Sequence, residues 1–350
     1  DVLLQKAPIQ NHYLAFSGGN QKTTFRVSMG YLSQGAVIEG KFDYDRLSFK
    51  ADINTQLKDW LTIENTLNGY HIANNGPVGG SVYQIMSNLE HPPTIPTYYS
   101  NGEYGSVDGS YYSSNPMPAQ WTPLMYANLG DNNTRYTNFN DRFNIIIKPY
   151  PGFSFETALT ANLYYNDNSN YTPYYDLKDW DGNILQLSGY NNLTNSFTKQ
   201  NRLLADNLLR FNRTLNDMHD ITLLVGHSAM YYLNDWFSGR LENFPTENIQ
   251  EFNGGGVSNP AVSGSLLEES MQSFFGRINY VYKNRYLFEA NFRRDGSSKF
   301  GPEYRYGNFP SLSAGWRISE ESFMQSLVSK NLLNYLKIRA SWGRTGNNRV

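Results

Sequence analysis

Two early segments of the chain, positions 24–31 and 46–57, alternate between apolar and polar residues. The apolar residues occupy odd positions: Phe25, Val27, Met29, Tyr31, Leu47, Phe49, Ala51, Ile53 and Leu57. The even positions carry the polar residues: Thr24, Arg26, Ser28, Arg46, Ser48, Lys50, Asp52, Asn54 and Gln56. Successive side chains of a β-strand point to opposite faces of a sheet. The pattern therefore predicts strands with one apolar face and one face rich in charges and amides.

Similar alternation recurs along the chain and predicts about a dozen strands in an antiparallel meander. The further runs lie at 12–17, 61–72, 138–148, 153–163, 202–213, 220–232, 274–282, 286–293, 311–318 and 336–343.

The predicted connections are alternately short and long. Short turns are expected near 18–21, 58–60, 149–152, 216–217 and 283–285, where Gly, Pro, Asn and Asp gather. Long loops are expected at about 73–137, 166–200, 233–272 and 294–310. An up-and-down transmembrane barrel has tight turns at one end and long loops at the other. A short helix with an acidic first turn is expected within 319–335, in place of a tight turn.

Composition is compatible with this all-β transmembrane class. Aromatic residues make up 15% of the chain, and strands favour them. Mean hydropathy is −0.56, and no run reaches the roughly 18 apolar residues of a membrane helix. A barrel, however, exposes only alternate residues to lipid and is polar on average. The net charge of −2 gives no electrostatic footprint for nucleic acid.

The termini and the missing cysteines add context. Asp1 opens a polar segment and the last strand-like run ends shortly before Val350, so we expect a piece of a longer protein. The absence of cysteine fits a reducing compartment and a bacterial envelope equally well.

The polar sides of the predicted strands carry many charges. They include Arg26, Arg46, Lys50, Asp52, Glu156, Glu289, Arg293, Arg317, Lys337 and Arg339. So many charges cannot fill a dry core unpaired. They suit a water-filled lumen or a wall against a polar plug, and the alternative is a soluble sheet with this face in water. Aromatic residues near strand ends, such as Tyr31, Tyr165 and Trp316, favour the membrane interpretation.

Catalytic patterns are missing from the sequence. The histidines are spread widely, at His12, His71, His91, His219 and His227, and none forms a metal-binding pair. There is no nucleophile elbow, P-loop or dinucleotide fingerprint. Asp131 and Asp141 are candidates for a cation site, although no spacing resembles an EF-hand. We therefore predict a protein that is not an enzyme, with no catalytic residue, cofactor or metal.

Aromatic residues in the predicted long loops are candidates for contact with a substrate or a partner. They are Tyr98, Tyr99, Tyr104, Tyr111, Tyr112, Trp121, Trp180 and Trp236, with Tyr174 and Tyr175 nearby. Aromatic faces stack on sugar rings or pack against a partner. The alternative is that these rings pack the loops against themselves.

A series of motifs in the last third of the chain is specific. It comprises SFFGRINY at 273–280, KNRY at 283–286, RRDGSSKFG at 293–301, FPS at 309–311, GWRISEE at 315–321 and LKIRASWG at 336–343. Together with FSGG at 16–19, this series resembles the barrel of the SusC/RagA family of TonB-linked outer-membrane transporters of Bacteroidota. The resemblance covers essentially the whole chain.

The resemblance implies a function. The fold would be part of a plugged barrel of about twenty-two strands, with the plug and the last strands outside this chain. The family partner is a SusD-like surface lipoprotein, in a dimer of transporter–lipoprotein pairs. TonB would act through the absent N-terminal region to import glycans, oligosaccharides or peptides. Alternatives are a TonB-dependent siderophore or vitamin receptor and a soluble surface glycan-binding β-domain.

The RRDGSSKFG segment has two interpretations. Its residues of interest are Arg293, Arg294, Asp295, Gly296, Ser297, Ser298, Phe300 and Gly301. They form either a loop of fixed shape near the plug or lid, or a turn in which Asp295 and Gly296 leave a strand. The turn is the interpretation we favour.

Overall fold

The computed structural model describes residues 4–77, 96–107, 120–179, 181–187, 189–326 and 332–348. Its main feature is one antiparallel sheet of 12 strands, in which neighbours in space are also neighbours in chain order. The strands are β1 (Ile9–Gly19), β2 (Thr23–Gly35), β3 (Asp43–Lys58), β4 (Leu61–Gly76), β7 (Asp131–Ile147), β8 (Phe153–Thr172), β11 (Asn192–Leu215), β12 (His219–Glu242), β13 (Gly256–Tyr282), β14 (Tyr286–Ser297), β15 (Tyr306–Arg317) and β16 (Lys337–Gly343).

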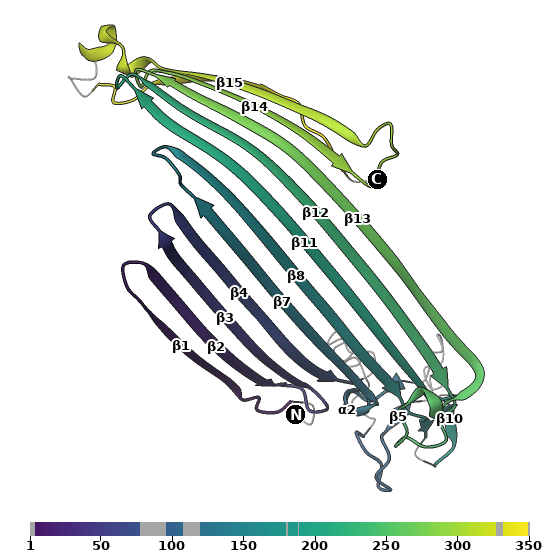
Figure 1. The fold of residues 1–350 in the computed structure, drawn as a ribbon. Coiled ribbons are helices and arrows are strands. Elements are labelled where there is room, and N and C mark those ends of the chain that lie inside the picture. Colours follow the sequence, from purple (N-terminus) through teal and green to yellow (C-terminus); the bar gives the residue numbers. More distant parts are fainter. Residues whose placement is uncertain are drawn as a thin grey trace.

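This arrangement confirms the predicted meander. The sheet is long and curved, with β1 and β16 at its two edges (Figure 1). The tight turns gather at the upper left of the view and most of the longer connections at the lower right (Figure 1). The fold is therefore an open part of an up-and-down barrel wall.

In two of the tight turns, the backbone conformation explains the choice of residues. Asn216 and Asp217 follow β11 with φ of 51° and 52°, and Lys283 and Asn284 follow β13 with φ of 48° and 57°. Each pair forms the centre of a β-turn, which the Met218 amide closes on the Leu215 carbonyl at 3.1 Å and the Arg285 amide closes on the Tyr282 carbonyl at 2.9 Å. Positive φ at both central residues gives the turn type whose twist matches that of the strands. Asn and Asp tolerate this conformation better than most residues, which explains their use at three of the four positions.

The predicted bounds of the long loops were wrong, because the strands run much further. β8 continues to Thr172 and β11 begins at Asn192, so most of 166–200 is strand. Within 233–272 only 243–255 lies outside β12 and β13, and β14 and β15 leave only 298–305 between them. The loop at 73–137 narrows to 77–130. Polar residues such as Asn195 and Asp235 interrupt the alternation on the apolar face of these outer parts, whereas the backbone ladder continues, with one irregularity between Arg240 and Glu242.

Small elements cover the loop end of the sheet. They are β5 (Ser106–Val107), β6 (Gln120–Trp121), α2 (Pro123–Asn128), β9 (Asp176–Lys178), β10 (Ile184–Leu187) and the 3-10 turn η3 (Phe252–Gly254). A small apolar cluster of Tyr171, Leu193 and Phe244 joins the sheet to these connections. The loops are thus packed onto the sheet.

The connection between β15 and β16 begins with two 3-10 turns, η4 (Ile318–Glu320) and η5 (Ser322–Met324). The helix predicted within 319–335 therefore does not begin at its acidic residues: Gln325 and Ser326 are helical after the two turns, and positions 327–331 lie outside the described residues. Glu321, between the turns, accepts hydrogen bonds from the Tyr286 hydroxyl at 2.6 Å and the Trp316 indole at 3.0 Å. This carboxylate secures the start of the connection to the sheet.

Candidate functional site: the two walls and the outer loops

The pairing register places the predicted charges on one face of the sheet. Arg26 lies opposite Asp52, Glu64 opposite Asn144, and Glu289 opposite Ser313. Because paired residues share a face, the same alternation carries the polar face across all twelve strands. The polar face also includes Arg46, Lys50, Glu156, Arg293, Arg317, Lys337 and Arg339.

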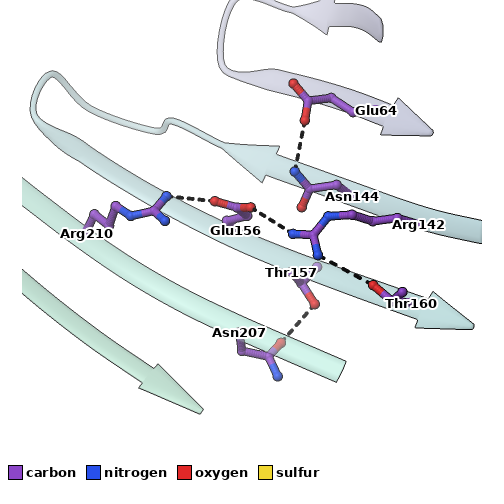
Figure 2. A network of polar contacts seen from close by, with 8 residues as sticks. All are labelled: Glu64, Arg142, Asn144, Glu156, Thr157, Thr160, Asn207 and Arg210. Atoms are coloured by element: carbon purple, nitrogen blue, oxygen red, sulfur yellow. Dashed lines mark hydrogen bonds and ion pairs between the residues drawn. The ribbon is translucent and has the colours of Figure 1, made fainter. Parts of the chain in front are cut away.

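Glu156 is the centre of the best-connected part of this face (Figure 2). Its carboxylate accepts a hydrogen bond from Arg210 at 2.7 Å and lies 3.7 Å from the Arg142 guanidinium. The Glu156 side chain is only 15% exposed. Two cations therefore share one largely buried anion, so the cluster keeps a net positive charge.

The network extends to neighbouring strands. Arg142 also donates to the Thr160 hydroxyl at 3.5 Å. Asn144 and Asn54 each donate to the Glu64 carboxylate, at 3.1 Å and 3.0 Å. A wall of this kind needs water or polar groups on its open side, as a lumen or a plug surface would provide.

The opposite face of the sheet is apolar and exposed. Leu14, Phe16, Leu159 and Val225 are each about 60% exposed. Large contiguous apolar surfaces are rare on soluble monomers and mark contact with lipid or protein. No second sheet covers this face among the described strands, which argues against a soluble sandwich.

A row of aromatic residues lies on this apolar face at the turn end, and Tyr231 lies on the same face toward the loops. At the turn end, His219, Tyr282, Tyr286 and Trp316 form successive ring contacts of 5.0, 6.2 and 6.4 Å. Toward the loops, Tyr231 lies 12 residues beyond His219 on the same face of β12. At about 3.3 Å per residue this is about 40 Å along the strand, or about 28 Å of height at a tilt of about 45°. An outer-membrane barrel has an apolar band about 25 Å tall between aromatic girdles.

Across the described segments, no helix is long and apolar enough to span a bilayer.

The predicted loop aromatics are only partly brought together. Tyr98 and Tyr104 pair at 5.0 Å between ring centroids, and the Tyr99 hydroxyl donates to the Ser106 carbonyl at 3.0 Å. These three rings therefore pack the loop against itself. Trp121 lies in β6. Tyr111, Tyr112 and Trp180 lie outside the described residues.

The prediction that Trp236 lies in a loop was wrong, because Trp236 is part of β12. It shares the polar face with Asn234 and Tyr232, two and four residues away. The continuous ladder with β11 and β13 explains why the strand reaches past the alternating segment.

A pocket of about 490 Å³ lies where the outer connections meet. Lys41 forms an ion pair with Asp131 at 2.8 Å, and Lys178 forms one with Glu103 at 2.6 Å. The Lys178 ammonium lowers the pKa of Glu103 below its ordinary value. Sequence reasoning missed both ion pairs, although it considered Asp131 for a cation site, because the paired residues are about 75 to 90 positions apart.

Aromatic and amide groups complete the pocket. Tyr104, Tyr171, Asn128 and Gln250 contribute to its lining. Burial raises the pKa of Tyr104 to about 12, so its hydroxyl stays protonated at neutral pH. The buried Oδ1 of Asp176, also in the lining, has no hydrogen-bond partner among the described residues. The pocket can accept hydroxyl, amide or ammonium groups while its rings cover apolar parts of a ligand.

The RRDGSSKFG segment does not form the predicted turn at Asp295 and Gly296. Both residues are inside β14, where Asp295 pairs with Gly307 and Gly296 with Tyr306. The strand ends after Ser297, and Ser298 still donates to the Ser270 carbonyl at 2.9 Å. A side chain at Gly296 would meet the Tyr306 ring at 2.4 Å, so this glycine serves packing and not a turn.

The remaining motif residues are divided between strand and connection. Arg293 and Arg294 lie in β14 on opposite faces, whereas Phe300 and Gly301 lie in the connection to β15. Lys299 in the same connection forms an ion pair with Glu269 at 3.0 Å.

The two carboxylates considered for a cation site are not together. Asp131 pairs with Lys41, whereas Asp141, ten residues along β7, accepts a hydrogen bond from Asn65 at 2.7 Å. No group of three His, Asp or Glu residues suited to a metal occurs within the described ranges.

Comparison with known proteins gives a consistent result. The chain is 32% identical to a TonB-dependent receptor of Formosa agariphila over 96% of its length, and 25% identical to the TonB-dependent receptor SusC of Bacteroides thetaiotaomicron over its whole length. These matches span about a third of the curated relatives, namely 30% and 35% of their lengths. No family model matches the chain.

Solved structures agree in fold. The RagAB peptide transporter superimposes with a TM-score of 0.76 over the whole chain, at 19% identity, and the match covers 38% of that chain. The RagAB peptide importer in its closed-closed state gives 0.75 over 99% of this chain, at 19% identity and 38% coverage.

Proposed function

Because the chain belongs to the SusC/RagA-like TonB-dependent receptors, we propose that the whole protein imports oligosaccharides or peptides across the outer membrane. This stretch supplies barrel wall and outer loops. The observation that carries the proposal is the two-faced sheet, whose apolar side is exposed and carries a row of aromatic residues at the turn end, as a wall facing lipid would. The polar side, centred on Glu156 and its two arginines, then lines the passage.

The outer pocket supports this substrate class. Its carboxylates, amides and tyrosine rings suit a ligand with many hydroxyl or amide groups, as oligosaccharides and peptides have. RagAB, whose fold the chain shares, is a peptide importer, which supports peptides as one of the two classes. No bond of the substrate needs to change in such a mechanism.

The partner would be a SusD-like lipoprotein that closes over the outer loops, and the energy would come from TonB. Ligand binding shifts an equilibrium only if the ligand favours one state. A ligand held between loops and lipoprotein must therefore favour a plug state on which TonB can act. The complex would be a dimer of transporter–lipoprotein pairs in the outer membrane of a Bacteroidota-like cell.

Uptake by the full-length protein in its native host tests this proposal. A deletion strain should lose growth on one class of oligosaccharide or peptide, and a strain lacking TonB should show the same loss. Affinity purification in mild detergent should recover a lipoprotein in equal amount. Unchanged uptake of both classes, together with loss of iron-siderophore or vitamin uptake, would instead support the receptor alternative.

A further inference from the structure

A groove of about 1060 Å³ crosses the apolar wall over β12, β13 and β14. Its apolar lining includes Val225, Phe274, Gly276, Ile278, Ala290 and Leu312. All six alternate onto the apolar face, since Gly276 pairs with Val225 and Ala290 pairs with Ile278 and Leu312. The groove therefore opens toward the side that we assign to lipid.

Small residues at its floor create the groove. Gly276 and Ala290 lie on neighbouring strands among the larger side chains of Phe274, Ile278 and Phe292. A Cβ placed on Gly276 would meet only the Leu224 carbonyl, at an ordinary 3.5 Å. The backbone would therefore accept a larger residue at position 276. The groove is empty because the side chains at positions 276 and 290 are small.

The loop-side end of the groove is polar. The Arg294 guanidinium lies 4.9 Å from the centroid of the Tyr306 ring, and both residues line the groove. The Tyr306 hydroxyl donates to Gln272 at 3.5 Å, and the Gln272 amide lies 3.0 Å from His227 Nε2. The groove is therefore amphipathic along its length.

Arg294 has no anionic partner among the described residues, although it is exposed on the apolar face. It lies 8 residues beyond Tyr286 of the turn-end aromatic row. That is about 26 Å along the strand, or about 19 Å of height at a tilt of about 45°. An unpaired cation below the upper edge of the apolar band is costly unless its head reaches the interface or finds an anion.

We propose that this groove binds an anionic lipid of the outer leaflet, with one acyl chain over Gly276 and Ala290 and the phosphate on Arg294. Arginine binds phosphate oxygens in a bidentate fork, and stacking on Tyr306 aims the guanidinium. The inference rests on the proposed membrane location.

A second groove on the same face provides a natural contrast. It measures about 590 Å³ and is lined by Leu159, Ala161, Ala205 and Ala229, but its charged residue is Asp141. A carboxylate repels a phosphate, so this groove should not select an anionic lipid. Charge complementarity is what distinguishes the two sites.

The test uses full-length protein purified from outer membranes in a neutral detergent, with bound lipid counted by native mass spectrometry and phosphorus assay. Wild type should retain phosphate-bearing lipid. Arg294→Gln removes the phosphate ligand and Gly276→Leu fills the groove, and each should lower retained lipid by about tenfold. Ala205→Leu, in the second groove, should retain as much lipid as wild type. Heat-dependent migration on gels confirms that each barrel is folded.

Equal lipid in all four proteins would overturn the proposal, as would loss in Ala205→Leu alone. If Arg294→Gln separated an oligomer while lipid stayed bound, the groove would be a protein contact instead. These outcomes are separable from failure of the proposed function: a protein that imports substrate but carries no lipid overturns only the groove, whereas a protein that needs no detergent overturns the membrane location itself.

Discussion

The Arg293 side chain donates through Nε to both carboxylate oxygens of Asp295, at 2.6 and 2.8 Å, from two residues away on the same strand. A second guanidinium nitrogen reaches the Ser273 hydroxyl on β13 at 2.9 Å. The most recognisable motif of the chain therefore joins two strands on the polar face. The contribution of the Arg293–Asp295 ion pair to stability can therefore be measured by mutation.

Replacing Asp295 with Asn should lower the free energy of unfolding modestly. Arg293 is 44% exposed and Asp295 is 19% exposed, so solvent screens the pair and the expected loss is about 0.5–1 kcal/mol. Denaturant unfolding in detergent measures it. A double-mutant cycle with Arg293→Gln should return a coupling energy of similar size, and a coupling near zero would contradict a structural role for the pair.

Replacing Glu156 with Gln should cost more. The change leaves Arg142 and Arg210 side by side without their shared anion, in a place where the Glu156 side chain is only 15% exposed. We expect a loss of about 2 kcal/mol in unfolding free energy. Glu289→Gln is the control, because Glu289 accepts a hydrogen bond from Asn291 but joins no ion pair in the described part of the chain. Equal losses of unfolding free energy in both variants would show that the ion pairs of Glu156 do not stabilise the protein.

Two glycines on facing strands should respond differently to alanine. A Cβ on Gly226 would meet the Phe275 ring at 2.3 Å, whereas one on Gly276 meets its nearest neighbour at 3.5 Å. Gly226→Ala should therefore destabilise the barrel by about 1–3 kcal/mol through overpacking, and Gly276→Ala should be nearly neutral. Thermal unfolding of both variants in the same detergent decides this.

Stability should depend on the charge of Glu321 at acid pH. Hydrogen bonds from Tyr286 and then Trp316 lower the pKa of Glu321 in the folded protein. A lowered folded pKa means that the stabilisation is fully present above the ordinary glutamate value of about 4.3 and is lost as pH falls through the folded value. Glu321→Gln should thus melt earlier than wild type at pH 7, and the gap should close at the lowest pH. A constant gap would show that the charge plays no part.

Adjacent residues of β15 test which face meets lipid. Leu312 lies on the apolar face and is 47% exposed, while Ser313 lies on the polar face opposite Glu289. Leu312→Arg should cost about 2–4 kcal/mol in lipid and reduce the amount of folded protein in outer membranes. Ser313→Arg gains Glu289 as a neighbour and should insert normally. Normal insertion of both variants would contradict the membrane assignment.

Sequence reasoning recovered the strands best where one face is apolar and the other polar, as in 24–31 and 286–293. It failed in the outer parts of β11, β12 and β13, because residues such as Asn195, Ser238 and Ser263 give no alternation while their backbones still pair. The sequence did not predict the pocket in which Lys41 pairs with Asp131, because the two residues are 90 positions apart in the chain. The motif around Asp295 was recognisable, but recognition did not reveal that it lies within a strand.

The order of the strands has a consequence for how the wall forms. Each strand pairs only with its predecessor and successor in the chain, and positive-φ hairpins at Asn216 and Lys283 set the register of two neighbouring pairs. Pairing within each hairpin can begin at its turn and extend along the two strands. Most contacts therefore join residues that are close in sequence, which keeps the contact order low for so large a sheet. The long connection between β4 and β7 is the main exception to these short-range pairings. Assembly can therefore proceed hairpin by hairpin from one edge of this sheet to the other.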